Sequence, residues 1–262
     1  MNKLKDKVIW ITGASSGIGE ALAYGFAKEG AKLVLSSRKE TELKRVAEKC
    51  SCESLILPLD LSNSAEFNSL AKQVIDHFGT IDILINNGGI SQRSEASSTT
   101  LEVDRKLMEV NYFGTVALTK AVLPYMQHQK SGHLVAISSL SGKFGFFLRS
   151  AYSASKFALI GFYESLRLEE EKNNVKVSLV FPGFVQTKIS QNALSGDGQK
   201  HAKLDNNQKG GITPEKCARD IIRGIKKDKH QIITGGTEKW GILVNRLFPK
   251  FFYSILRNKS GE

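Results

Sequence analysis

Tyr152 and Lys156 stand four residues apart in a segment whose pattern predicts a helix. Residues at positions i and i+4 lie on one face of a helix, with Cβ atoms about 5–6 Å apart. A lysine ammonium beside a phenol favours the phenolate, so we expect Lys156 to lower the pKa of Tyr152 from its usual value of about 10. Tyr152 is therefore a candidate proton donor and acceptor. The same spacing also fits a surface helix with an exposed lysine.

A glycine-rich turn near the N-terminus is a second candidate. It follows the apolar, β-branched segment 7–12 and opens a helix that ends at Gly30. Strand, turn and helix in this order cradle a pyrophosphate, because small residues admit the backbone and the helix N-terminus supplies N–H groups. The turn residues that we assign to a dinucleotide are Gly13, Ser15, Ser16, Gly17, Ile18 and Gly19.

The end of the next predicted strand, 31–36, bears on the choice of dinucleotide. An acidic residue about twenty positions after the turn binds the ribose 2′-OH of NAD, whereas an arginine suits the 2′-phosphate of NADP. Here Arg38 follows the strand, and Glu40 already belongs to the next helical pattern. We expect NADP(H) rather than NAD(H), since a guanidinium pairs with a phosphate through two hydrogen bonds. The alternative is that Arg38 is an ordinary surface arginine.

Polar or small residues also follow four later strands at their carboxyl ends, where ligands of open parallel sheets bind. The strands predicted at 54–59, 81–85, 133–138 and 175–181 are followed by Asp60 and Leu61, by Asn87 and Gly88, by Ser139, and by Pro182 and Gly183. Asp60 either accepts a hydrogen bond from an adenine amino group or caps a turn. Pro182 ends strand pairing, and Gly183 lets the backbone approach a ligand closely.

The helix predicted at about 104–127 carries Asn111 in its interior. An asparagine inside a helix is costly unless its side chain is bonded, because it competes with the backbone for hydrogen bonds. Asn111 is therefore either a hydrogen-bonded core residue or a functional one.

Strands alternate with helices along the chain, and a last strand is predicted at 230–234. This alternation predicts an α/β fold: a doubly wound, Rossmann-type parallel sheet of about seven strands in three α/β/α layers. We assign residues 1–237 to one catalytic domain. Within it, the polar segment 186–212 is a predicted substrate lid, since so long a loop in a compact domain is usually a lid or disordered.

Composition excludes several other classes of protein. The 262 residues are 41% hydrophobic, enough for one substantial core, and no run of 18 apolar residues predicts a membrane span. Without a signal-peptide pattern and with three cysteines, two of them close together, we expect a reduced, cytoplasmic protein without a metal site. The net charge of +11 comes without basic runs interleaved with aromatics in the first 200 residues, so nucleic-acid binding is not expected.

The C-terminal segment 238–262 combines aromatic and basic residues, and we predict a helical extension there. Basic residues outnumber acidic ones eight to three over residues 226–262. Segments of this kind can lie in the interface of a membrane. Residues 240–257 would then give the protein a peripheral contact with a membrane surface. The alternative is a helical tail packed on its own or a partner subunit.

Six motifs occur in one order and spacing over about residues 5–235. They are Thr12-Gly13-x-x-x-Gly17-x-Gly19, Asn86-Asn87-Gly88-Gly89, Asn111, Ser139, Tyr152-x-x-x-Lys156 and Pro182-Gly183-x-x-x-Thr187. In this the chain resembles the short-chain dehydrogenase/reductase family. It departs from the family at Gly88, where an alanine is usual, and we expect the missing methyl to loosen that loop slightly.

The resemblance implies a catalytic tetrad of Asn111, Ser139, Tyr152 and Lys156. Tyr152 would be the general acid or base, Lys156 would lower its pKa and bind the nicotinamide ribose, Ser139 would hold the substrate oxygen, and Asn111 would hold a water in a proton relay. It places Asp60 and Leu61 at the adenine, Asn87 and Gly88 at the adenosine ribose, and Val185 and Thr187 at the nicotinamide amide. It also implies a homodimer or homotetramer.

The resulting hypothesis is an NADP(H)-dependent oxidoreductase that reduces a ketone or aldehyde, or oxidises a secondary alcohol. Its specificity would come from the loops 91–100, 142–149 and 186–212. The second of these is apolar, and its Phe144, Phe146, Phe147 and Leu148 either line a hydrophobic cleft or pack as core or interface. A steroid-, lipid- or ketoacyl-like substrate fits the first option. The alternative function is a catalytically silent dinucleotide sensor or scaffold with the same fold.

Overall fold

The computed structural model describes residues 3–203 and 205–257. Three parts of the predicted segments lie outside this range: Met1 and Asn2 of the domain, Leu204 of the predicted lid, and residues 258–262 of the extension. All statements below concern the described residues.

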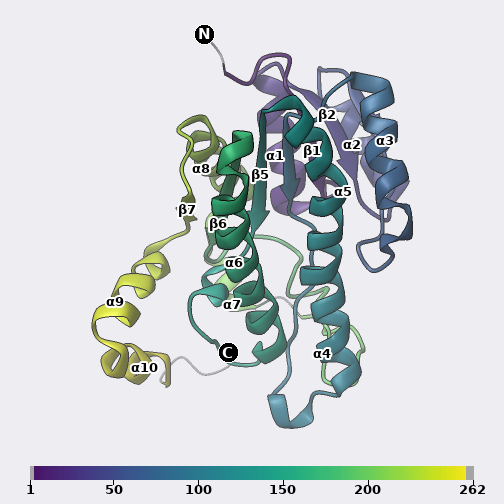
Figure 1. The fold of residues 1–262 in the computed structure, drawn as a ribbon. Helices are drawn as coiled ribbons and strands as arrows, with labels where there is room; N and C mark the ends of the chain where they lie inside the picture. The colour runs from purple at the N-terminus through teal and green to yellow at the C-terminus, as the bar shows by residue number, and fades with distance from the viewer. Residues whose placement is uncertain (1–2, 204, 258–262) are drawn as a thin grey trace.

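Seven parallel strands form one sheet in the order β3-β2-β1-β4-β5-β6-β7. Figure 1 labels β1, β2, β5, β6 and β7 of this sheet. They are β1 (Val8–Thr12), β2 (Lys32–Ser36), β3 (Ser54–Ile56), β4 (Ile83–Asn86), β5 (Gly132–Ile137), β6 (Val175–Pro182) and β7 (Gln231–Thr234). From β3 the chain crosses to the other side of β1 and continues outward with β4. The connections that follow β1 and β4 therefore run in opposite directions along the sheet. Doubly wound sheets bind ligands at such a switch point. The predicted fold class is confirmed.

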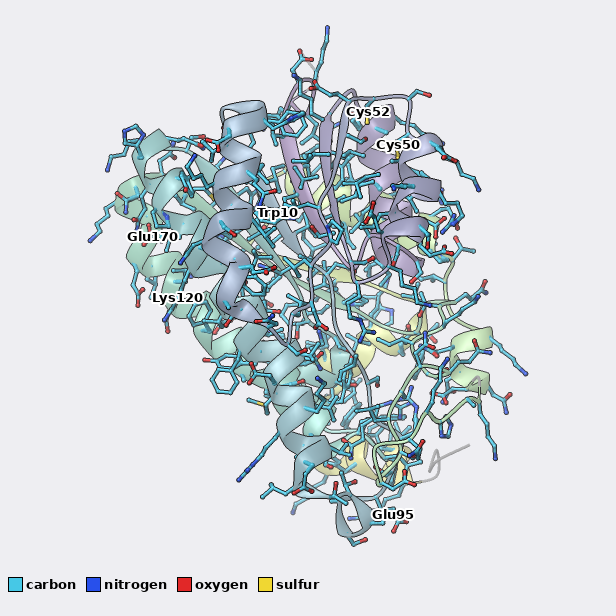
Figure 2. All side chains as sticks on the ribbon, turned by 90° about the vertical axis from the view of Figure 1, so that its right-hand side faces the viewer. Trp10, Cys50, Cys52, Glu95, Lys120 and Glu170 are labelled. Carbon is cyan, nitrogen blue, oxygen red and sulfur yellow. The ribbon has the colours of Figure 1, made fainter. Side chains whose placement is uncertain are left out.

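Helices cover both faces of the sheet. They are α1 (Gly17–Lys28), α2 (Glu40–Glu48), α3 (Phe67–Phe78), α4 (Leu101–Met108), α5 (Gly114–Gln129), α6 (Ser150–Glu170), α7 (Asn206–Lys209), α8 (Pro214–Lys226), α9 (Gly241–Leu247) and α10 (Pro249–Arg257). Side chains along β1 point alternately to the two faces of the sheet and so belong to two hydrophobic cores. Ile9 and Ile11 pack with α1, α2 and α8, whereas Val8 and Trp10 pack with α3, α5 and α6. Trp10 is fully buried (Figure 2).

Two elements differ from the sequence prediction. The strand predicted at 54–59 is shorter, because Pro58 has no N–H to donate, although Leu57 and Leu59 still donate to the carbonyls of β2 and Ser37. The helix predicted at 104–127 begins at Leu101, ends at Gln129 and is interrupted by a π-helical turn, η3 (Glu109–Phe113), that contains Asn111. Such turns occur frequently at functional sites.

The C-terminal extension folds back on the domain through α9 and α10, which extend beyond the carboxyl end of β7 in Figure 1. Phe252 and Leu256 on α10 are buried in the core, and the rings of Phe252 and Phe144 meet edge to face at 4.7 Å. This part of the extension is thus a helical tail packed on its own chain. No helix in the described part of the chain is long and apolar enough to cross a membrane.

Candidate active site

A cleft of about 1360 Å³ lies over the carboxyl ends of the strands. Every residue assigned to a site from the sequence lines this cleft, with two exceptions. Gly19 and Asn111 lie behind its wall, where both are buried. The topology therefore brings together residues from six strand ends that are up to 170 positions apart in the sequence.

The glycine-rich turn is shaped by close approaches that exclude side chains. Gly13 and Gly17 have φ of +64° and +59°, a conformation that glycine adopts without strain. A Cβ on Gly19 would lie 2.3 Å from the carbonyl oxygen of Gly13. Helix α1 begins at Gly17, and its N-cap Ser16 makes no side-chain capping bond. The backbone thus forms a cradle with helix N–H groups at its end, which fits a pyrophosphate.

Side chains from elsewhere hold this turn in place. Arg45 on α2 donates to the carbonyl oxygen of Ser15 (3.2 Å) and to Glu20 Oε1 on α1 (2.7 Å). The Thr12 hydroxyl accepts hydrogen bonds from the backbone N–H groups of Asn87 (3.0 Å) and Gly88 (2.9 Å). Asn87 Nδ2 in turn donates to Thr12 O (2.9 Å), so the ends of β1 and β4 are joined. Sequence reasoning missed Arg45, whose partner lies 30 residues away.

Gly88 is the position at which the chain departs from the family pattern. A Cβ at this position would lie 2.7 Å from Leu61 Cδ1 and 3.3 Å from Thr12 Oγ1. The Leu61 side chain therefore occupies the space of the missing methyl, and the expected slight loosening of the loop stays a prediction.

The end of the cleft that we assign to adenosine is lined by Arg38 and Asp60. Arg38 is exposed and lines the cleft, while the hydroxyl of Ser36 at the strand end is taken up by a hydrogen bond from Trp10 Nε1 (2.9 Å). Glu40 pairs with Lys44 on α2 and is not part of the lining. Asp60 Oδ1 accepts from the backbone N–H and hydroxyl of Ser62, so it caps a turn.

Helix α6, which carries Tyr152 and Lys156, is capped by a distant side chain. Its N-cap residue Arg149 makes no side-chain capping bond. Instead, Gln92 Oε1 accepts from the N–H groups of Ala151 (3.0 Å) and Tyr152 (3.4 Å). Gln92 is fully buried, so it fixes the start of α6 against the loop after β4. Its partners lie some 60 residues away, and no local pattern in the sequence reveals them.

The pKa of Tyr152 is raised, which contradicts the expected lowering. Burial is the main cause, and it outweighs a hydrogen bond with Ser139 and the charges of Arg93 and Arg149. Burial also lowers the pKa of Lys156 to about 8. Lys156 Nζ donates to Ile137 O (2.9 Å) and lies 5.8 Å from the centre of the Tyr152 ring. The prediction considered only the charge of Lys156 and not the burial of the phenol, and both side chains are buried.

The two serines after β5 have separate hydrogen-bond partners. Ser139 Oγ accepts from the N–H of Ser141 (3.1 Å) and faces Tyr152. Ser138 Oγ donates to the carbonyl oxygen of Lys156 (3.0 Å) and so anchors α6 to the strand. Of the two, Ser139 is the one placed to meet a substrate oxygen.

Asn111 is fully buried and its side chain is bonded at both ends. Oδ1 accepts from Ile90 N (2.8 Å), and Nδ2 donates to Ile90 O (3.0 Å) and Ser155 Oγ (3.0 Å). Ser155 Oγ donates to the carbonyl oxygen of Tyr152 (2.7 Å). Asn111 therefore joins the π-helical turn to the loop after β4 and to α6. The relay role that the resemblance implies for it stays a prediction.

The substrate side of the cleft is walled by three segments. Phe144 and Phe146 from the loop 142–149 line it together with residues of α9 and α10, while Phe147 is exposed. The segment 186–212 closes over it, and Leu194 there exchanges backbone hydrogen bonds with Ser91 and Arg93. Arg93 and Arg149 also line the cleft, and neither was singled out from the sequence.

The cysteines and the metal-binding residue types lie outside this chemistry. Cys50 and Cys52 lie at one end of the molecule and Glu95, beside the cleft loops, at the other (Figure 2). Burial raises the pKa of Cys50 to about 11 and of Cys217 to about 12, which keeps both as thiols. Within the described residues, no three His, Cys, Asp or Glu side chains are grouped to hold a metal ion.

Comparison with known proteins gives consistent matches. Residues 7–198 match the family model described as short chain dehydrogenase. A "Dehydrogenase/reductase SDR family protein 7-like" of Anopheles gambiae is 43% identical over 98% of this chain and 84% of its own length. The "Dehydrogenase/reductase SDR family member 7B" of Mus musculus is 39% identical over 98% and 82%. A solved short-chain dehydrogenase/reductase from Burkholderia phymatum in complex with NAD has a TM-score of 0.84, covering 96% of each chain; at 24% identity, this likeness concerns the fold alone.

Proposed function

The chain belongs to the short-chain dehydrogenase/reductase family, and from that premise we propose that it is an NADP(H)-dependent oxidoreductase. It would reduce a ketone or aldehyde, or oxidise a secondary alcohol. The observation that carries the proposal is that Tyr152, Lys156 and Ser139 line the same cleft as the glycine-rich cradle. A nicotinamide nucleotide held there would supply or accept the hydride.

The residues of this chain would handle the proton. The raised pKa keeps the Tyr152 phenol protonated at neutral pH, which suits it to donate to a carbonyl oxygen during reduction. Ser139 is placed to hydrogen-bond the same oxygen. With its pKa at about 8, Lys156 exchanges a proton easily near neutral pH. It would hold the nicotinamide ribose and supply the proton that returns the phenolate to the phenol.

The preference for NADP(H) is supported by the adenosine end of the cleft. Arg38 and Lys39 line it, and the strand-end Ser36 is buried rather than acidic. Glu42 also lines the cleft, but its carboxylate is paired with Arg45 (2.8 Å). A 2′-phosphate would thus meet an available guanidinium, while a 2′-OH would find no unpaired carboxylate at the strand end.

Turnover of carbonyl compounds tests the proposal. NADPH oxidation would be followed over a panel of ketones, ketosteroids and 3-ketoacyl compounds. Tyr152→Phe should reduce turnover by about 10²- to 10⁴-fold while cofactor binding, measured by fluorescence, remains. Near-normal turnover in that variant would contradict the assigned role, and cofactor binding without any turnover by the native protein would favour the sensor or scaffold.

We also propose peripheral contact with a membrane surface, for an otherwise cytoplasmic protein. Among the described residues, seven of the thirteen exposed large hydrophobic side chains lie between Trp240 and Ile255. Lys239, Arg246 and Lys250 lie among them, and this mixture suits an anionic lipid interface. The buried side of α10 holds the extension to the domain, so the outer side is the one offered to lipid.

Vesicle co-sedimentation tests this contact. Phe248→Ser with Phe251→Ser should lower the fraction bound to anionic vesicles several-fold, because both rings are more than 60% exposed and their loss spares the core. Leu168→Ser on α6, an equally exposed position, is the matched control. Equal vesicle binding by the native protein and the double phenylalanine variant would contradict the membrane contact. The extension would then be a packed tail or a homo-oligomer interface.

A further inference from the structure

Two buried arginines lie on the substrate side of the cleft. Arg93 comes from the loop after β4 and Arg149 from the position before α6, and their exposed fractions are 8% and 9%. Both line the cleft. A buried guanidinium needs a partner of opposite charge, because desolvation of an unpaired charge is costly.

The two guanidinium groups share a single carboxylate. Asp205 Oδ2 accepts from Arg93 Nε (2.8 Å), from Arg93 Nη2 (2.6 Å) and from Arg149 Nη2 (2.8 Å). Within residues 3–203 and 205–257, the ion pairs of both arginines end on this one oxygen. The cluster therefore carries one net positive charge. Burial and the like charge of Arg93 lower the pKa of Arg149 to about 10, as expected for incomplete compensation.

The shared carboxylate and the arginines belong to different parts of the molecule. Asp205 stands in the segment 186–212, at the N-cap of the one-turn helix α7. Arg149 immediately precedes α6, and Arg93 is held by Ser91 Oγ (2.8 Å). The two positive charges are thus fixed on the loop after β4 and next to α6, which also position Tyr152. Their negative partner, Asp205, is supplied by the segment 186–212.

The cluster lies within electrostatic reach of the reacting group. The charges of Arg93 and Arg149 both act on the Tyr152 phenol. The Arg149 guanidinium also lies over the ring of Phe146, 4.9 Å from its centre, so the charge borders the aromatic wall. A ligand with its carbonyl at Tyr152 and an apolar body against Phe146 would bring a further polar group to the arginines.

We propose that Arg93 and Arg149 form a subsite for an anionic group of the substrate, a carboxylate or a phosphate, in competition with the Asp205 carboxylate. This rests on the proposed carbonyl reduction, since it names the class of its substrate: an apolar carbonyl compound with an acidic group. A guanidinium group suits both anions, because two of its N–H groups can donate to two oxygens of a carboxylate or of a phosphate.

Binding of small matched probes tests the subsite without turnover. The protein, saturated with NADP⁺ so that the phosphate contacts of the cofactor are occupied, is titrated calorimetrically with hexyl phosphate, hexanoate and hexanol. At least one anion should bind about tenfold or more tightly than hexanol, since hydrogen bonds between charged groups are stronger than those of a neutral hydroxyl. The better of the two anions identifies the acidic group.

Three variants locate the preference. Arg149→Gln should remove most of the tenfold preference, Arg149→Lys should keep part of it, and Asp205→Asn should strengthen anion binding because a competing charge is lost. Arg223→Gln on α8 removes one exposed guanidinium outside the cleft lining and should change binding less than about twofold.

Equal affinity of the native protein for all three probes would overturn the subsite, as would an undiminished preference in Arg149→Gln or weaker anion binding in Asp205→Asn. The cluster would then only anchor the covering segment. These outcomes are independent of the proposed function: loss of the anion preference with retained ketone turnover refutes the subsite alone. Absence of turnover with an intact anion preference refutes the proposed reaction instead.

Discussion

The two halves of the cleft are built by different means. The half that we assign to the cofactor is formed by backbone at Gly13, Gly17 and Gly19, where a side chain would collide. The half that we assign to the substrate is formed by side chains on three loops and two C-terminal helices, such as Arg93, Phe146 and Arg149. The first half depends on local stereochemistry and the second on contacts between distant segments.

This difference explains why a short glycine motif marks the first half in the sequence, whereas no such motif marks the walls of the second. A backbone cradle tolerates few residue types, so the same short motif recurs wherever the cradle is needed. A wall of side chains can be rebuilt without moving the sheet, which is how one fold accepts many substrates. Lys156 stands where the two halves meet, and its burial offers the largest measurable effect.

Replacing Lys156 should change how stability depends on pH. Burial depresses its pKa from 10.5 to about 8 in the folded protein, so above pH 8 the unfolded chain binds more protons than the folded one. The free energy of unfolding should therefore rise between about pH 8 and 10.5, by about 3 kcal/mol for this group. Below pH 8 both states carry the proton, and the cost of burying the charge is fully present. Urea unfolding of Lys156→Met should lack this rise.

Lys120→Met is the matched control, because Lys120 is exposed on α5 (Figure 2). The difference in unfolding free energy between native protein and Lys156→Met should change across the pH range, while that for Lys120→Met should stay constant. Parallel curves for all three proteins would show that the Lys156 ammonium is not desolvated, and would favour the alternative of a helix with an exposed lysine.

The sequence predicted the sheet and the place of the glycine-rich turn after its first strand, for a physical reason. Strand–helix alternation and the glycine spacing express local constraints, so the seven strands and the position of the cradle follow from neighbouring residues. The capping of α6 by Gln92, the bond from Arg45 to Ser15 and the cluster around Asp205 join residues 30 to 112 positions apart. No local pattern encodes such pairs. The sign of the Tyr152 pKa shift was missed for the same reason, since burial depends on the whole fold.

Gly19→Ala probes how rigid the backbone cradle is. The new Cβ would lie 2.3 Å from the carbonyl oxygen of Gly13, so the turn must shift. We expect a loss of about 1–3 kcal/mol in unfolding free energy and at least about tenfold weaker NADP⁺ binding. Gly161→Ala is the control: its Cβ would meet nothing within 4 Å on α6, and alanine there should stabilise the helix by up to about 1 kcal/mol. Unchanged NADP⁺ affinity in Gly19→Ala would mean that the cradle adapts as freely as the substrate half.

Arg38→Ala tests a part of the cofactor half in which a side chain, rather than backbone, would contact the cofactor. Arg38 is exposed at the rim, so its contribution to a 2′-phosphate is partly screened by water. We expect the ratio of kcat/KM for NADPH over NADH to fall by about tenfold, with Arg38→Lys in between because it keeps the charge but loses the two-pronged geometry. Arg105→Ala, an exposed guanidinium on α4 outside the cleft lining, should leave the ratio unchanged. If the ratio survives in Arg38→Ala, cofactor choice is made by Lys39, another side chain, or by the backbone cradle. In the second case the division between a backbone-built and a side-chain-built half extends to specificity itself.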